Sequence, residues 1–220
     1  MILTHGANSL SQLISTVTID GRSYATVKIG NQWWMAENLD YKFQYNGSTL
    51  PIGSSGTPTT PAAWYYNNSE SDYGIDGTYK CGLLYNWYAA KYLDDNKATL
   101  LPSGWHVPTL SEWNILITAV GGISTAGLKL KASDNSVTSS WPSGWNETDT
   151  YGFNSLPAGR RTNDAEFLYV GQNQNFIIID EYSQANMYRI NVNVTDAVEI
   201  LSSGNNKIWG VSLRLVKGTE

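Results

Sequence analysis

Near its start the chain alternates hydrophobic and polar residues, a two-residue period that is typical of half-buried β-strands. Asp20 and Gly21 follow the first alternating run, and because both residue types tolerate positive φ they favour a tight hairpin. Gly30 and Asn31 form the next turn signal. The pattern therefore predicts a meander of three strands, at residues 17–19, 24–29 and 32–35.

In the middle of the chain the hydrophobic period becomes helical. Thr109 and Glu112 have the spacing of a capping box, in which the Thr hydroxyl and the Glu carboxylate each accept a hydrogen bond from a backbone amide of the first turn. One apolar face follows at i, i+3, i+4 and i+7, formed by Trp113, Leu116, Ile117 and Val120. Gly121 and Gly122 supply a left-handed cap at the end. A second, shorter helix is predicted at residues 84–92.

After residue 151 the pattern changes back to that of strands. Turn residues at 171–174 and 202–206 separate the runs. The predicted strands lie at residues 166–170, 175–180, 186–195, 197–201 and 207–216. Because helices and strands occupy different parts of the chain, the fold class is expected to be α+β, with two helices and mixed or antiparallel sheets.

A single domain at residues 17–216 is the simplest organisation, because a chain of 220 residues can bury one large core. Residues 1–16 are polar and aperiodic, and we expect them to form a loose N-terminal arm. Residues 46–62 are rich in Gly, Ser, Thr and Pro, which indicates a long surface loop. Cys81 is the only cysteine, so the chain has no internal disulfide, and we interpret it as a small, half-buried hydrophobic residue.

The composition narrows the partners that the protein could bind. Charged residues make up 15% of the chain, against about 25% in typical globular proteins. The net charge is −5 and there is no run of basic residues, so neither nucleic acid nor an anionic membrane surface is an expected partner. No apolar stretch is long enough to enter a bilayer. Residues 1–6 lack the pattern of a secretory signal peptide. Nine Trp and 14 Tyr indicate aromatic contact surfaces instead.

Candidate catalytic and metal-binding residues are scarce. The chain has two His and one Cys, too few for a zinc site, and no spacing matches a calcium loop. His106 precedes the capped helix and is interpreted as a structural turn residue. Asp180 and Glu181 could supply one half of a glycosidase carboxylate pair, but the second half has no candidate. We therefore expect no catalytic residue, no metal and no cofactor.

Four stretches of the chain resemble the Fibrobacter succinogenes major paralogous domain, in the same order, from about residue 17 to residue 216. They are Lys28–Leu39, Gly82–Ala90, Pro102–Thr109 and Gly152–Gly159. The third stretch, extended to Trp113, is also similar to the motif of formylglycine-generating-type domains. Those enzymes use paired cysteines, so a chain with only Cys81 cannot share that activity. The resemblance implies a C-type lectin-like fold.

Further expectations come from the same resemblance. Domains of this type recur as variable proteins of diversity-generating retroelements in phages and gut bacteria, where the C-terminal half carries ligand-binding residues. The closing residues 207–215 are similar to their usual ending, and Glu37 and Arg214 match the family pattern as framework residues. The resemblance implies a protein of the virion or bacterial cell surface that binds an unknown protein or glycan on a cell surface. A homo-oligomer is compatible with this interpretation.

Strand alternation indicates which side chains would face a partner. If Phe176 and Ile178 enter the core, then Ile177 and Ile179 are exposed, which folding alone does not require. Tyr, Asn and Ser on a rigid scaffold are also typical of binding surfaces. The expected ligand-binding residues are Arg160, Thr162, Asn163, Glu166, Leu168, Asn173, Asn175, Ile177, Ile179, Tyr182, Asn186, Ile190, Asn191, Asn193, Ile208 and Trp209.

Two other functions stay open on the sequence alone. One is a structural or adhesive surface module whose C-terminal strands pack against a second copy or a neighbour, without genetic diversification. The other is a carbohydrate-active enzyme that uses Glu181. The resemblance and the aromatic and Asn-rich C-terminal strands favour the binding protein over both.

Overall fold

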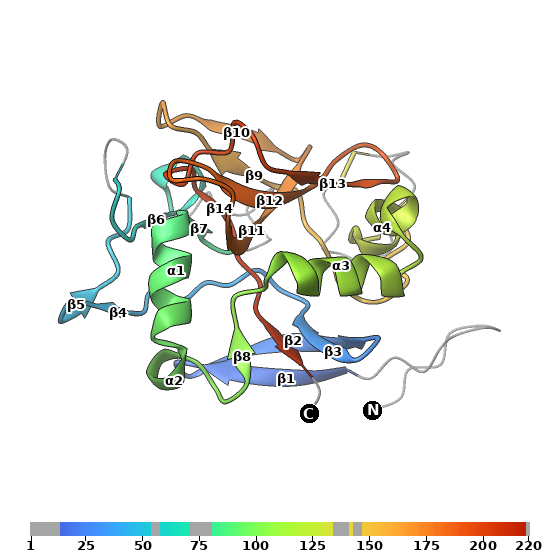
Figure 1. Ribbon diagram of the computed structural model, residues 1–220, viewed down its shortest axis with the longest axis horizontal. Coiled ribbons are helices and arrows are strands. Elements are labelled where there is room, and N and C mark those ends of the chain that lie inside the picture. Colours follow the sequence, from blue (N-terminus) through green and yellow to red (C-terminus); the bar gives the residue numbers. More distant parts are fainter. Residues whose placement is uncertain (1–13, 54–57, 71–80, 134–140, 143–146, 219–220) are drawn as a thin grey trace.

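The protein consists of two large sheets, one two-stranded sheet and four short α-helices (Figure 1). The computed structural model describes residues 14–53, 58–70, 81–133, 141–142 and 147–218. The strands are β1 (Ile14–Ile19), β2 (Arg22–Ile29), β3 (Gln32–Met35), β4 (Gln44–Tyr45), β5 (Ser48–Thr49), β6 (Ala63–Trp64), β7 (Leu84–Tyr85), β8 (Trp105–His106), β9 (Ala158–Arg161), β10 (Phe167–Val170), β11 (Gln174–Glu181), β12 (Met187–Val192), β13 (Val198–Leu201), β14 (Val211–Ser212) and β15 (Val216–Gly218). The helices are α1 (Trp87–Asp95), α2 (Lys97–Leu100), α3 (Leu110–Ala119) and α4 (Ile123–Leu130), with a 3-10 turn at Tyr66–Asn68.

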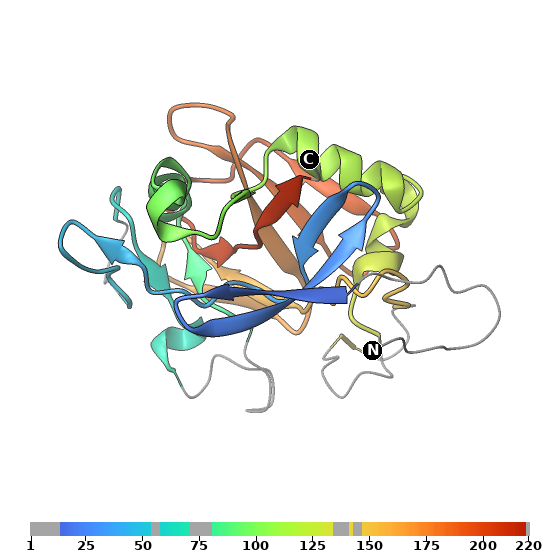
Figure 2. The ribbon, with the colours of Figure 1, turned by 90° about the horizontal axis from the view of Figure 1, so that it is seen from below.

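The first sheet joins the two ends of the described chain. Its strand order is β1-β2-β3-β15-β8, all antiparallel. The predicted hairpin is confirmed, because Asp20 and Gly21 both have positive φ, at 48° and 77°, between β1 and β2. Figure 2 shows β15 beside β3, so the last strand closes the sheet that the first strands open. Residues 14–16 belong to β1 and not to the expected loose arm, whose residues 1–13 lie outside the described part.

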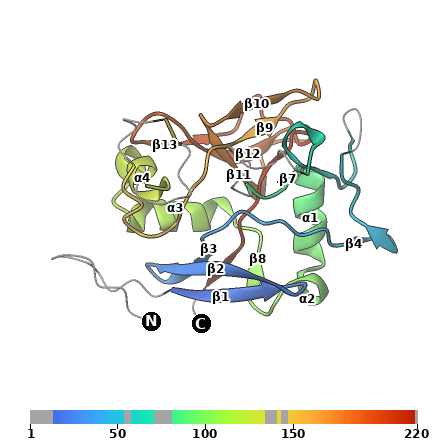
Figure 3. The same cartoon turned by 180° about the vertical axis from the view of Figure 1, so that it is seen from behind.

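The second sheet carries the C-terminal half. Its strands run in the order β10-β9-β11-β14-β7-β6, and β12 pairs with both β11 and β13. β11 is parallel to β9 and β14 but antiparallel to β12, so the sheet is mixed as expected. In Figures 1 and 3 this sheet lies above the first one, with α1 on one side and with α3 and α4 on the other.

β11 is the central strand of the molecule and is covered on both faces. Phe176 and Ile178 pack in the core beneath α3 and α4, whereas Ile177 packs in the core around α1. Ile177 is therefore only 1% exposed, and the expectation that it faces solvent is wrong. The alternation was assigned correctly, but a strand between two layers has no solvent face. Ile179, near the end of the strand, is half-buried against the α1 core.

The best-defined helix begins and ends where the sequence indicates. Thr109 caps α3, its hydroxyl accepting from the Glu112 amide at 3.2 Å while the Glu112 carboxylate accepts from the Thr109 amide at 2.8 Å. At the other end the Gly122 amide donates to the Ile117 carbonyl at 2.8 Å, and Gly121 has a φ of 102°. The capping box and the glycine cap are both confirmed.

The other helices depart from the prediction. The predicted helix at 84–92 begins only at Trp87, because residues 84 and 85 pair as β7 and Asn86 caps α1 by accepting from the Ala89 amide at 2.9 Å. α2 and α4 were not expected, so the prediction of two helices is wrong. α4 contains Gly127, a weak helix former, yet a Cβ there would lie 2.5 Å from the Ala197 carbonyl oxygen. Gly127 thus weakens the helical pattern in the sequence, but the absence of its side chain lets α4 approach the C-terminal strands.

The C-terminal residues 207–216 do not form the single strand that was predicted. They contribute β14 and the first residue of β15, separated by the buried residues 213–215, among them Arg214. Its Nε donates to Asn38 Oδ1 at 2.9 Å and its Nη2 to the Asn154 carbonyl at 2.7 Å. Burial lowers the pKa of Arg214 to about 9. The framework role expected for Arg214 is thus confirmed, since it ties the two ends of the chain to its middle.

The other regions expected to be irregular or half-buried are more ordered than predicted. The short β4–β5 hairpin enters the region expected to be a loop at 46–62, and Leu50 in that region is buried. Residues 54–57 lie outside the described part. Cys81 is fully buried at 3% exposure and not half-buried as expected.

Candidate functional site

Two arginines and two aromatic rings form a cluster at the surface where β9, β10 and β12 meet the residues before β14. We call Arg160, Tyr169, Arg189 and Trp209 the arginine–aromatic cluster. The Cζ atom of Arg160 lies 4.7 Å from the ring centre of Tyr169 and 4.8 Å from that of Trp209. The Cζ atom of Arg189 lies 5.6 Å from the ring centre of Trp209. These are cation–π distances, so each guanidinium is held against an aromatic face.

The backbone under Tyr169 is in an unusual conformation. Tyr169 has a φ of 64°, in the left-handed region that bulky residues avoid, and its side chain is 43% exposed. Opposite it, Gly159 has a φ of 68°, and a Cβ there would lie 2.4 Å from the Leu168 carbonyl oxygen. A left-handed non-glycine residue costs about 1–2 kcal/mol. The fold accepts this cost and holds an aromatic ring outward over Arg160, a type of local strain that is frequent at functional sites.

Buried amides hold the inner part of the cluster. Arg189 is only 6% exposed, and it donates through Nε to Asn205 Oδ1 at 2.6 Å and through Nη1 to Asn175 Oδ1. Burial and, to a smaller extent, the nearby positive charge of Arg160 lower the pKa of Arg189 to about 10. The Trp209 indole donates to Asn163 Oδ1 at 3.1 Å. The cluster is therefore rigid and electropositive.

The cluster lacks an internal counter-charge. Within the described residues no carboxylate oxygen lies within 4.0 Å of a nitrogen of Arg160 or Arg189. Glu199 is the carboxylate that contributes to the pKa of Arg189, and its side chain accepts from Asn191 at 2.6 Å. Since buried charges are usually paired, the cluster differs from an ordinary structural ion pair.

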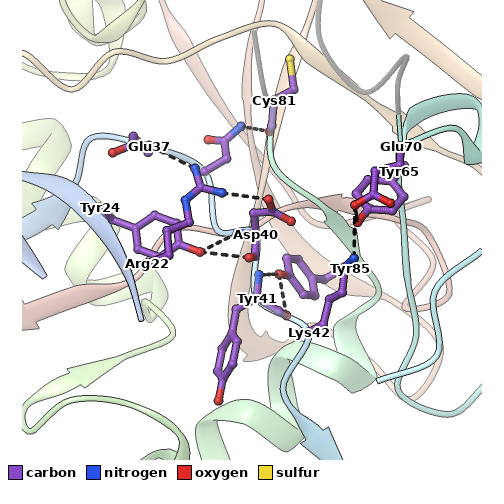
Figure 4. A network of polar contacts seen from close by, with 11 residues as sticks. Arg22, Tyr24, Glu37, Asp40, Tyr41, Lys42, Tyr65, Glu70, Cys81 and Tyr85 are labelled. Atoms are coloured by element: carbon purple, nitrogen blue, oxygen red, sulfur yellow. Dashed lines mark hydrogen bonds and ion pairs between the residues drawn. The ribbon is translucent and has the colours of Figure 1, made fainter. Parts of the chain in front are cut away.

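A polar pocket elsewhere in the molecule shows the opposite arrangement (Figure 4). Arg22 contacts Asp40 at 2.8 Å and Glu37 at 3.2 Å. Lys42 contacts Glu70 at 3.4 Å. This pocket of about 250 Å³ lies between the β1–β2 turn and the 3-10 turn region. Its cations are matched by carboxylates, which fits the framework role expected for Glu37.

Tyrosines complete the network of this pocket. The Tyr85 hydroxyl accepts from the Tyr41 amide at 2.7 Å and donates to the Tyr41 carbonyl at 3.0 Å, as drawn in Figure 4. Burial raises the pKa of the Tyr85 phenol well above its usual value. The Tyr24 hydroxyl donates to the Asp40 carbonyl at 3.0 Å. The network thus satisfies its own polar groups, and we interpret it as structural.

The expected ligand-binding residues are only partly brought together. Arg160 and Asn163 each contact Trp209 of the cluster. Four more of the expected residues are exposed or half-exposed and lie beside the cluster or along the same strands. They are Glu166, Leu168, Asn173 and Ile208. Farther along β11, β12 and their turns lie Ile179, Tyr182, Asn186 and Asn193. Tyr182 is 47% exposed and packs on Tyr188 with ring centres 5.3 Å apart, whereas Asn193 donates to Glu199 at 3.0 Å.

Five of the expected residues are buried, so their expected exposure to a ligand is wrong. They are Thr162, Asn175, Ile177, Ile190 and Asn191. Asn175 and Asn191 are directly paired on adjacent strands. Other strands lie beyond this pair, so the two residues are inside the sheet and not at its edge. Asn175 instead positions Arg189, because its Oδ1 accepts a hydrogen bond from Arg189 Nη1. Polar residue type alone therefore overestimates exposure on these strands.

Tyr169 and Arg189 belong to the cluster but were not expected. By strand alternation Tyr169 would lie on the face opposite to Glu166 and Leu168, the residues that were expected to face a partner. Its left-handed φ turns the side chain outward instead. That conformation has no signature in a single tyrosine. Arg189 carried a weak signal: it is one of only five arginines, and four of these, with Arg160, Arg161 and Arg214, lie in the C-terminal half.

Residues considered for catalysis are engaged in structural contacts. Asp180 Oδ2 accepts from the Leu110 amide at 2.6 Å, at the start of α3, and Glu181 pairs with Lys207 at 2.8 Å. His106 Nε2 lies 2.6 Å from Glu112 Oε1, and this hydrogen bond raises the pKa of His106. Over the described residues, no group of three or more His, Cys, Asp or Glu side chains is placed to hold a metal ion.

The fold and the cluster together define an α+β protein with two large sheets, which presents a rigid cationic and aromatic surface from its C-terminal half. The family model described as the Fibrobacter succinogenes major domain matches residues 27–217, so the chain belongs to this family. No curated protein and no solved structure matches the chain significantly. None of the described helices is long and apolar enough to cross a membrane.

Proposed function

We propose that this protein is a ligand-binding protein with a C-type lectin-like fold, which captures a protein or glycan on a cell surface through its C-terminal half. The observation that carries the proposal is the exposed Tyr169, held at a strained φ of 64° against Arg160, whose guanidinium also contacts Trp209. Folding alone gives no reason to hold an aromatic ring outward at an energetic cost, whereas binding does.

The arrangement of the strands supports the lectin-like part of the proposal. β15 pairs with β3, so the described ends of the domain lie together in the first sheet, while the C-terminal strands form a separate sheet above it. Such an arrangement leaves the upper sheet and its turns free to vary without disturbing the closure of the domain. The resemblance to C-type lectin-like variable proteins adds the expectation that ligand-binding residues lie in this upper part.

The residue types of the cluster suit a contact surface. Trp, Tyr and Arg dominate the residues that carry most of the free energy of binding in protein interfaces, because they combine large area with directed polar groups. Here Trp209 is fixed by Asn163, and Arg160 is fixed by two rings, so little side-chain entropy is lost on binding. The exposed residues beside the cluster would add further contacts.

We further propose that the protein acts on a virion or a bacterial cell surface, as a variable protein of a diversity-generating retroelement. Many copies on such a surface would turn modest affinity at each site into strong attachment. A reverse transcriptase gene and a near-identical copy of the 3′ end of the coding sequence should then lie beside the gene. A genome that lacks both removes the retroelement part of the proposal and leaves the binding part standing.

Labelled protein applied to washed cells of a panel of gut bacteria and to a glycan array tests the binding function. Tyr169→Ala and Trp209→Ala should each weaken binding by about tenfold or more, as is usual for a truncated central contact. Ile14→Ala is the control, since Ile14 is 64% exposed on β1, on the opposite side of the molecule. Binding that survives both aromatic substitutions contradicts the proposal, as does the absence of any binding by the wild-type protein.

Light scattering separates this function from that of a structural module. A binding protein should keep its oligomeric state when Trp209 is replaced by alanine. If the wild-type protein forms oligomers that Trp209→Ala dissociates, the cluster instead serves self-association.

A further inference from the structure

Hydrogen-bond donors exceed acceptors around Trp209. Nε of Arg160 and Nδ2 of Asn205 are buried and have no hydrogen-bond partner among the described residues. The orientation of the Asn205 amide is fixed, because its Oδ1 accepts from Arg189 Nε. Its NH₂ group is therefore the end that lacks a partner. Native proteins leave few buried donors unsatisfied, so these donors call for an explanation.

Positive charge is in excess at the same place. Nη2 of Arg189 forms no hydrogen bond with the described residues. Arg189 also forms no salt bridge with them. Arg160 and Arg189 both contact the Trp209 ring, so their charges add in one small region. The whole chain has a net charge of −5, which makes a local surplus of guanidinium groups unusual. A bound group with a negative charge would offset this surplus.

The geometry restricts the form of such a group. Arg160 is half-buried, and the rings of Tyr169 and Trp209 contact its guanidinium plane. Its Nε is buried, so the edge formed by Nη1 and Nη2 is the one left for a ligand. That edge presents parallel N–H groups that match the two oxygens of a carboxylate. Tyr169, which is 43% exposed, lies beside it and offers an aromatic surface for the apolar C–H face of a ring.

The surroundings of the cluster argue against a ligand with many charges. Asp164 and Glu166 are exposed in the turn between β9 and β10, and they would repel a run of acidic residues. The neighbouring Asn163 and Asn173 side chains are neutral hydrogen-bonding groups. One negative charge on a hydroxyl-rich ring fits this mixture better than an acidic peptide does.

Building on the proposed function, we infer that the arginine–aromatic cluster binds a sugar that carries a single carboxylate, such as a terminal hexuronide or sialoside. The carboxylate would lie at the edge of the Arg160 guanidinium, within the field of Arg189. The sugar ring would lie against Tyr169 and Trp209, and its hydroxyl groups would reach the amides of Asn163 and Asn173.

Surfaces that carry many copies of one defined sugar provide the test. The probes are methyl glucuronide and methyl glucoside, which differ in the carboxylate alone, and sialyllactose and lactose, which differ in one acidic sugar. The wild-type protein should bind at least one acidic member and should bind its neutral counterpart about tenfold or more weakly, the usual size of a charge-assisted contact. Which acidic sugar binds identifies the source of the carboxylate.

Substitutions connect the binding to the cluster. Arg160→Gln should weaken binding of the acidic sugar by about 10- to 100-fold, and Arg160→Lys should restore it only in part, because lysine keeps the charge and loses the planar edge. Lys91→Gln on α1 is the control with an equal loss of charge. Thermal unfolding of each variant shows that the fold is intact, and Arg160→Lys keeps the test decisive if Arg160→Gln does not fold.

Three results would overturn the inference. They are equal binding of the charged and neutral sugars, equal binding by wild type and Arg160→Gln, and equally strong binding of a poly-glutamate surface. The proposed function fails separately, because it requires Tyr169 and Trp209 for attachment to cells whatever the charge of the ligand. Attachment that depends on the aromatic residues but ignores Arg160 would refute the carboxylate and keep the binding surface.

Discussion

The strain at Tyr169 can be isolated by comparing two substitutions, Tyr169→Ala and Tyr169→Gly. Both remove the aromatic ring and its contact with Arg160, so that loss cancels in the comparison. At an ordinary position in a strand, alanine is more stable than glycine by about 0.5–1 kcal/mol, because glycine loses more backbone entropy on folding. At a φ of 64° the order should be reversed.

The magnitude follows from two opposing terms. The left-handed conformation costs alanine about 1–2 kcal/mol and costs glycine almost nothing. Subtracting the entropy penalty of glycine, about 0.5–1 kcal/mol, leaves the glycine variant more stable by about 0.5–1 kcal/mol. Such a difference corresponds to a rise in Tm of about 1–4 °C for a domain of this size.

Denaturant unfolding followed by tryptophan fluorescence measures this difference, with the m-values of the two variants checked for equality. Both variants should also lose attachment to cells to the same extent, since the ring is absent from each. A glycine variant that is less stable than the alanine variant would refute the reasoning, because it would mean that residue 169 does not adopt the left-handed conformation in solution.

Three further predictions concern the framework around the site. Gly159→Ala should destabilise the protein by about 1–3 kcal/mol or prevent folding, because its Cβ would lie 2.4 Å from a carbonyl oxygen; denaturant unfolding measures this. NMR titration should find the pKa of His106 above its ordinary value in the wild type and lower in Glu112→Gln. The stability from this pair should therefore be full below about pH 6.5 and should decline as pH rises through the raised pKa. Burial raises the pKa of Asp149 to about 6, so the folded state binds its proton more tightly and loses stability as pH rises from about 4 to 6. Asp149→Asn should remove this loss and be more stable than wild type by about 1–3 kcal/mol at pH 7.5; a variant with the unchanged pH profile would contradict the assignment.

Local sequence signals predicted the parts of the fold that short-range chemistry determines. The capping box at Thr109 and Glu112 and the hairpin at Asp20 and Gly21 involve only neighbouring residues, and both are present. α4 was missed because its stability comes from packing against residues distant in sequence, which Gly127 permits and which no local propensity reveals.

The site was predicted less completely than the fold. Arg160, Asn163 and Trp209 were identified, and they do come together. The burial of Ile177 was missed because a strand's period shows which residues share a face but not how many faces are covered. Tyr169 was missed because its exposure depends on a backbone angle that tyrosine rarely adopts.

The most direct test of the central claim is the NMR signal of the Trp209 indole N–H, assigned by its loss in Trp209→Phe. This group donates to Asn163 at the centre of the proposed binding surface. When the acidic sugar that binds best is added, the Trp209 signal should shift in proportion to occupancy, while the signals of the buried Trp34 and Trp113 indoles stay in place. Saturation of binding without any change at Trp209 would show that the ligand binds elsewhere and would contradict the account.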